Sequence, residues 1–162
     1  IETLSPSMDI QISSNFERYL YDLAGKSSKQ LQLWMDEFEQ RGELKIESNL
    51  HKKAQQDFAS ARADDEEILS VIRKFNQDYK YLLDPHSAVG ICAAEKIDIR
   101  TPVICLACAH PAKFSMTIKK ALGTEIILPK TLASLQNLQT RNKTVTADPE
   151  AIKKLMLETL GI

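Results

Sequence analysis

The sequence contains no apolar run approaching the roughly 18 residues that a membrane span requires. Its charge is nearly balanced, with 21 basic and 22 acidic residues and a net charge of −1, so neither a basic nucleic-acid-binding surface nor a disordered acidic tail is indicated. No N-terminal signal or transit pattern is present. At 162 residues and 43% hydrophobic, the chain has the composition of a soluble globular domain. We therefore expect no nucleic-acid partner, no membrane partner and an intracellular location, cytoplasmic or mitochondrial.

Glycine and cysteine are scarce. The five glycines stand singly, so the sequence has no glycine-rich loop whose backbone N–H groups could hold a phosphate. Three cysteines at irregular positions favour a reducing compartment over a disulfide scaffold. Cys105 and Cys108 have the spacing of a redox or zinc pair, but in a strand their side chains would point to opposite faces, and no second pair completes four ligands. We expect no metal site.

The strongest local pattern lies between Pro102 and Gly123. Residues 103–109 form a short apolar run that predicts a buried strand, and the following Pro111 suits the first position of a helix. Apolar residues at helical spacing predict that this helix continues to Gly123. A strand end that meets a helix N-terminus is a common ligand site in α/β proteins. The alternative is an ordinary strand–helix corner that is buried for packing.

Other helices are predicted by their capping signals, and other strands by short apolar stretches. The strands are expected within residues 1–12, 43–47 and 126–129. Helices are expected to start at Ser14 (with Glu17 in a capping box), Ser27 (with Gln30), Asp64 (with Glu67), Asp84–Pro85 and Asp148–Pro149. Weaker patterns predict helices over residues 48–61 and 132–138. The expected fold class is α/β, rich in helices with a few mixed strands.

Three stretches, in the right order, resemble the threonine synthase family. They are residues 8–18, residues 84–90 (DPHSAVG) and residues 106–114 (LACAHPAKF), the last of which is similar to the family's C-terminal STAHPAKF signature. The resemblance covers residues 8 to 114, most of the chain. It implies the C-terminal part of a fold-type II pyridoxal-phosphate (PLP) enzyme, the tryptophan synthase β-like class. Residues 1–162 are then expected to be the C-terminal portion of such a domain, truncated at its N-terminus.

The resemblance implies a PLP-dependent lyase that converts O-phosphohomoserine and water to threonine and phosphate, a step of threonine biosynthesis. In the family, the Thr of the signature contacts the pyridine nitrogen of PLP. Here that position is Cys108, whose thiol is a weaker hydrogen-bond donor than a hydroxyl. The family's Schiff-base lysine belongs to a motif that this sequence lacks, and Lys113 does not occupy it. We expect Cys108 to bind the cofactor and the chain to hold no catalytic residue, so that it is incomplete by itself.

Three further residues are candidates for the pocket of a small phosphorylated amino-acid substrate. Asn15 and Arg18 lie at a predicted helix N-terminus, which suits anions. His86 lies in the first turn of an apolar helix, where a purely structural role is the alternative. The Cys108 departure leaves two other functions open: a divergent phospho-lyase that acts on an O-phosphorylated amino acid, and a non-catalytic relative that serves binding or assembly. The expected protein partners are the rest of a parent chain and, through an exposed sheet edge, a second copy.

Overall fold

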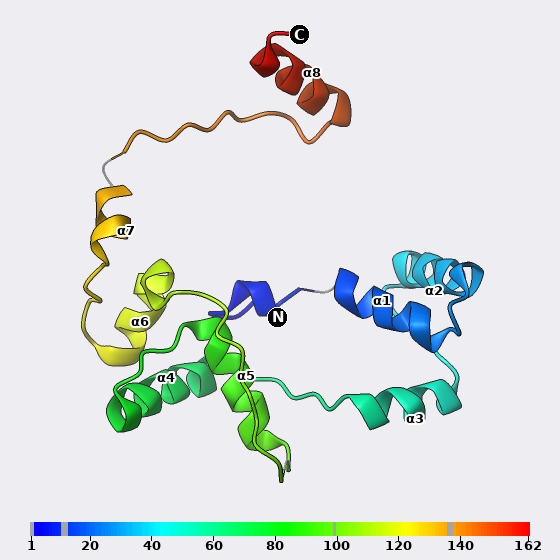
Figure 1. Ribbon diagram of the computed structural model, residues 1–162, viewed down its shortest axis with the longest axis horizontal. Helices are drawn as coiled ribbons and strands as arrows, with labels where there is room; N and C mark the ends of the chain where they lie inside the picture. Colours follow the sequence, from blue (N-terminus) through cyan, green and yellow to red (C-terminus); the bar gives the residue numbers. More distant parts are fainter. Residues whose placement is uncertain (1, 11–12, 99, 136–137) are drawn as a thin grey trace. The chain divides into compact units, whose positions relative to one another are not determined.

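The computed structural model describes residues 2–10, 13–98, 100–135 and 138–162, and its regular elements are all helical (Figure 1). In chain order they are the 3₁₀ helix η1 (Pro6–Met8), α1 (Ser14–Leu23), α2 (Ser28–Arg41), α3 (Ser48–Asp57), α4 (Asp65–Tyr79), α5 (Pro85–Lys96), the 3₁₀ helix η2 (Pro111–Phe114), α6 (Ser115–Leu122), α7 (Lys130–Leu135) and α8 (Pro149–Leu160). The chain divides into two compact units, Ile1–Ile127 and Leu128–Ile162.

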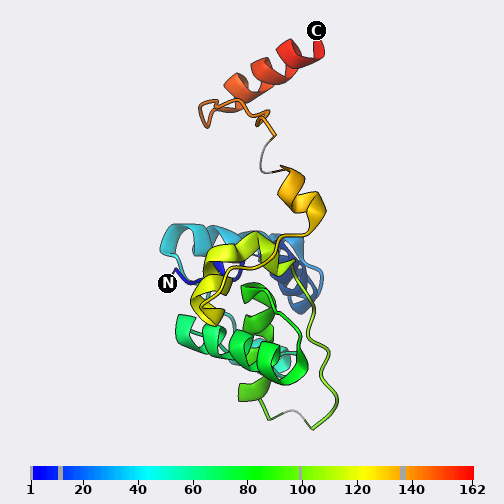
Figure 2. The same ribbon diagram turned by 90° about the vertical axis from the view of Figure 1, so that its left-hand side faces the viewer.

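The expected α/β class is wrong, because the described residues contain no strand. The run 103–109 forms neither helix nor strand, and Figure 2 draws it as a plain trace. Its side chains are exposed, Ile104 by 87% and Leu106 by 78%. A strand forms only where a neighbour takes up its backbone N–H and C=O groups, and an apolar run carries no information about that neighbour.

The other three expected strands are also absent. Residues 43–47 and 126–129 are irregular, and the stretch 1–12 contains η1 instead. Gln11 and Ile12 lie outside the described residues. Because no sheet is present in the described part of the chain, the reasoning from an exposed sheet edge and from opposite strand faces does not apply to it.

The larger apolar core joins α4, α5 and α6, which lie side by side in Figures 1 and 2. Ile68 and Ile72, one turn apart on α4, are completely buried, as are Ala88 of α5 and Ile118 of α6. The predicted capping box between Asp64 and Glu67 is confirmed at the start of α4. This core supports the first turn of α5, on which the candidate site is built.

A second core joins α1, α2 and α3 around Leu20, Leu23 and Trp34. The predicted cap at Ser27 is confirmed, because its side chain accepts the Gln30 N–H. The predicted capping box at Ser14 is wrong: α1 begins one residue earlier than that signal implies, with Ser13 as the cap residue and no side-chain cap bond.

The second unit contains α7 and α8. Asp148 caps α8 as predicted, by accepting the N–H of Ala151. Neither helix has a buried residue. Among the described residues, no helix of either unit combines the length and the apolar character that a membrane span demands.

Candidate functional site

The candidate site is organised by the buried carboxylate of Asp84, the cap residue of α5. Its Oδ1 accepts the backbone N–H of His86 at 2.9 Å and that of Ser87 at 3.4 Å. Its Oδ2 accepts the Ser87 hydroxyl and the backbone N–H of Ala109, the latter at 3.3 Å. Asp84 is only 2% exposed. One carboxylate therefore caps a helix and also holds a segment that lies 25 residues further along the chain.

These hydrogen bonds determine the charge state of Asp84. Burial by itself raises the pKa of this carboxyl, but the hydrogen bonds from Ser87 and His86 outweigh it and hold the pKa below its usual value. The carboxylate is therefore ionised at neutral pH although it is buried. Its charge is compensated by donors and by the N-terminus of α5.

His86 connects this carboxylate to η1. The backbone N–H of Ser7 donates to His86 Nε2 at 3.3 Å, and His86 Nδ1 lies 3.1 Å from Asp84 Oδ1. Because a backbone N–H can only donate, Nε2 carries no proton, and we assign the proton to Nδ1, which donates to Asp84. The ring also packs on Phe114, with centroids 4.6 Å apart. Both ring nitrogens of His86 are thus occupied by protein groups.

Ser87 holds the backbone of Cys108. The Cys108 N–H donates to Ser87 Oγ at 3.0 Å, while the same hydroxyl donates to Asp84. The Cys108 side chain itself is exposed, and its thiol donates to the carbonyl oxygen of Leu106 at an Sγ–O distance of 3.5 Å.

The structure does not bring the other two candidates into this network. Arg18 Nη1 donates to Asn15 Oδ1 at 2.9 Å on the exposed start of α1. Within the described residues, no hydrogen bond joins this pair to Asp84, His86 or Cys108, and the cavity beside Arg18 is lined by residues of α1 and α2 alone.

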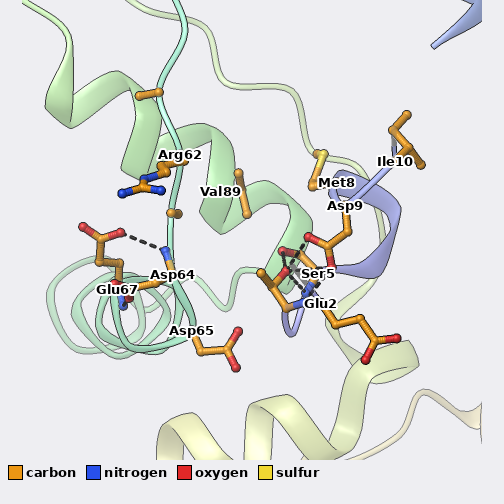
Figure 3. A pocket seen from close by; sticks show the side chains of 13 residues that line it. Glu2, Ser5, Met8, Asp9, Ile10, Arg62, Asp64, Asp65, Glu67 and Val89 are labelled. Carbon is orange, nitrogen blue, oxygen red and sulfur yellow. Dashed lines mark hydrogen bonds between the residues drawn. The ribbon is translucent and has the colours of Figure 1, made fainter. Parts of the chain in front are cut away.

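A cavity of about 700 Å³ lies beside η1 and is lined by several carboxylates (Figure 3). Figure 3 shows Arg62 and Glu67 at one end and Asp9 at the other. Asp9 accepts the hydroxyl and the N–H of Thr3, while Glu67 accepts the N–H of Asp64. These carboxylates have structural partners, and neither His86 nor Cys108 lines the cavity.

Comparison with known proteins shows one family. The family model "Threonine synthase, C-terminal" matches residues 87–156, a range that includes both Ser87 and Cys108. "Threonine synthase" of Schizosaccharomyces pombe is 38% identical over 138 residues, which are 76% of this chain and 27% of that protein. The chain belongs to the threonine synthase family.

Solved threonine synthases also share its fold. The crystal structure of PLP-bound threonine synthase from Brucella melitensis matches with a TM-score of 0.84 and 34% identity, over 98% of this chain and 34% of that one. The threonine synthase structure from yeast matches with a TM-score of 0.81 and 33% identity, over 99% and 37%. The chain spans about a third of the length of these threonine synthases, in agreement with the resemblance of its motifs to the family.

Three residues of the network are not among the site residues predicted from the sequence of this threonine synthase family member: Asp84, which was predicted only as a helix cap, Ser87 and Ser7. Ser87 was part of a recognised motif, but nothing local indicated that its hydroxyl would meet the backbone of Cys108. Ser7 takes part through its backbone N–H, which every residue except proline has, so its residue type could not indicate the contact. A serine two residues after an Asp–Pro helix start was the one available signal.

Proposed function

We propose that this chain is the C-terminal portion of a threonine synthase-like lyase that uses PLP and converts O-phosphohomoserine and water to threonine and phosphate. The observation that carries the proposal is the placement of Cys108. Its backbone N–H is held by Ser87, its neighbour Ala109 is held by Asp84, and its thiol is exposed. This is the position at which the family signature has its hydroxyl residue.

When bound, PLP acts as the electron sink for the reaction. Toward the cofactor, the contribution that we propose for this chain is orientation. Cys108 donates a hydrogen bond from its thiol toward the pyridine nitrogen, and the first turn of α5 keeps the Cys108 backbone in place. A Schiff-base lysine and a glycine-rich phosphate loop are absent from this sequence, and a longer protein that contains it would supply them.

We further propose that Asn15 and Arg18 bind the phosphate or the carboxylate of the substrate. Their support is chemical: the guanidinium of Arg18 and the amide of Asn15 lie together near the exposed start of α1, where backbone N–H groups also favour anions.

The test uses a longer protein that carries this chain, supplied with PLP and with O-phosphohomoserine. We expect a visible absorption band of the protein-bound cofactor, which borohydride removes, and formation of threonine and phosphate in equal amounts. Cys108→Thr restores the stronger donor and should raise turnover, whereas Cys108→Ala should weaken cofactor binding. Cys105→Ala, in the same exposed segment, is the matched control. Absence of the band at saturating PLP would refute the enzyme proposal.

A second candidate function is favoured by the thiol at position 108. A weaker donor to the ring nitrogen fits a divergent phospho-lyase that eliminates phosphate from another O-phosphorylated amino acid without forming threonine. Release of phosphate without threonine would select this candidate. Failure to bind PLP at all would leave the third expectation, a non-catalytic relative that serves binding or assembly.

A further inference from the structure

We propose that Ser87 and Asp84 are positioning residues for Cys108, acting as a two-step hydrogen-bond clamp on the backbone beside its thiol. The proposal rests on the proposed function, in which Cys108 faces the cofactor. The first turn of α5 then also positions Cys108, a role that capping the helix does not require.

The clamp has a defined direction. The Ser87 hydroxyl has one proton, which it donates to the Asp84 carboxylate. Its oxygen lone pairs are therefore available to accept the Cys108 N–H at 3.0 Å. The adjacent Ala109 N–H donates directly to Asp84 Oδ2 at 3.3 Å. Two successive amides are thus fixed by side chains that are only 5% and 2% exposed.

Capping alone does not account for these contacts. A cap residue needs to accept the free N–H groups of its own first turn, and Asp84 does this through Oδ1. Its second oxygen serves Ser87 and Ala109 instead. The segment that it holds has no ladder partner among the described residues, so its end is fixed by these bonds together with the packing of Phe114 on His86 just beyond it.

The first experiment measures amide hydrogen exchange in a longer protein that carries this chain, with the peptide covering residues 106–110 as the readout. Ser87→Ala removes the acceptor of the Cys108 N–H, and we expect roughly five- to tenfold faster exchange in this peptide. Ser87→Thr keeps the hydroxyl and should restore slow exchange. Ser70→Ala, at an exposed serine of α4, is the matched control. Circular dichroism identifies any variant that fails to fold.

The second experiment titrates PLP into the same variants. We expect Ser87→Ala to weaken PLP binding about fivefold, and Ser87→Thr to restore it. Unchanged exchange in Ser87→Ala would overturn the clamp. Faster exchange with unchanged PLP affinity would overturn its role in positioning Cys108. If the unsubstituted protein binds no PLP, the proposed function fails, while the exchange measurement still decides whether the clamp exists.

Discussion

Two helices of this chain start with the same pair of residues, Asp and Pro, but their cap residues differ in burial and in the groups that they bind. Asp84–Pro85 opens α5, and Asp148–Pro149 opens α8; in both, the Asp side chain accepts a backbone N–H and Pro occupies the first turn. Asp148 is exposed and caps only its own helix, whereas Asp84 is 2% exposed and also binds His86, Ser87 and Ala109.

The difference shows that a local signal defines where a helix begins but not what its cap does for the rest of the protein. Helix α5 consists mostly of small and apolar residues, so the core that it forms with α4 and α6 buries its first turn. This burial excludes water from the Asp84 carboxylate. Most of the donors that replace water belong to the first turn of α5, at His86 and Ser87, and one, the Ala109 N–H, comes from a segment 25 residues further along the chain. At α8, which has no buried residue, the Asp148 carboxylate accepts the Ala151 N–H and is otherwise exposed to solvent.

The largest expected effect comes from removing each cap in turn. Asp84→Ala leaves several buried donors without an acceptor, and we expect it to lower the free energy of unfolding by about 3–5 kcal/mol. Asp148→Ala should cost only about 1 kcal/mol, the usual value for an exposed cap. Urea unfolding followed by circular dichroism measures both changes.

Cys92, buried on α5, reports independently on that helix. Burial raises the pKa of its thiol to about 11, so iodoacetamide should spare Cys92 at pH 8 while it modifies the exposed Cys105 and Cys108. Asp84→Ala should make Cys92 reactive, and Asp148→Ala should not. Equal losses of stability in the two variants would remove the distinction between the caps.

The next effect is a dependence on pH. Because the folded-state pKa of Asp84 lies below that of the unfolded chain, its contribution to stability is fully present above the unfolded value, about 3.9. It is lost as the pH falls through the folded value. We expect the free energy of unfolding to fall more steeply below about pH 4 in the unsubstituted protein than in Asp84→Asn. The difference should persist at high salt, because buried groups are screened weakly.

Much of the helical structure was predictable from the sequence, whereas the strands that the sequence predicted are not found in the described residues. The caps at Ser27, Asp64, Asp84 and Asp148 act within four residues, so their side chains and spacing contain the necessary information. The strand expected over residues 103–109 depended on a neighbouring strand that the described residues do not provide. Periodicity cannot reveal a missing partner.

The candidate site was predictable in part for the same reason. Cys108 and His86 could be selected from motif resemblance. The bond from Cys108 to Ser87 spans 21 residues, and that from Ser7 to His86 spans 79. Long-range hydrogen bonds depend on tertiary packing, which residue type and spacing do not specify.

A smaller effect is expected from His86, where two substitutions separate its two bonds. Asn places an amide N–H near the position of Nδ1 and keeps the bond to Asp84, but it leaves the Ser7 N–H without its acceptor. Gln places its amide oxygen near the position of Nε2, so it keeps an acceptor for the Ser7 N–H but loses the bond to Asp84. We expect each to cost about 1–2 kcal/mol. Hydrogen exchange at residues 3–9 should accelerate in His86→Asn and not in His86→Gln; acceleration in both would contradict the assigned tautomer.

The smallest effect on stability is expected at the start of α1, where the polar pair Asn15–Arg18 is exposed. Arg18→Ala should change the free energy of unfolding by less than about 0.5 kcal/mol, because water replaces the lost hydrogen bond. In a longer, active protein the same substitution should raise KM for the phosphorylated substrate, since a guanidinium that binds an anion is no longer available. Arg41→Ala, at an exposed arginine of α2 that pairs with Glu37, is the matched control and should leave KM unchanged. A neutral result for KM at Arg18 would remove this pair from the substrate pocket and would leave the exposed start of α1, like that of α8, as a helix start and nothing more.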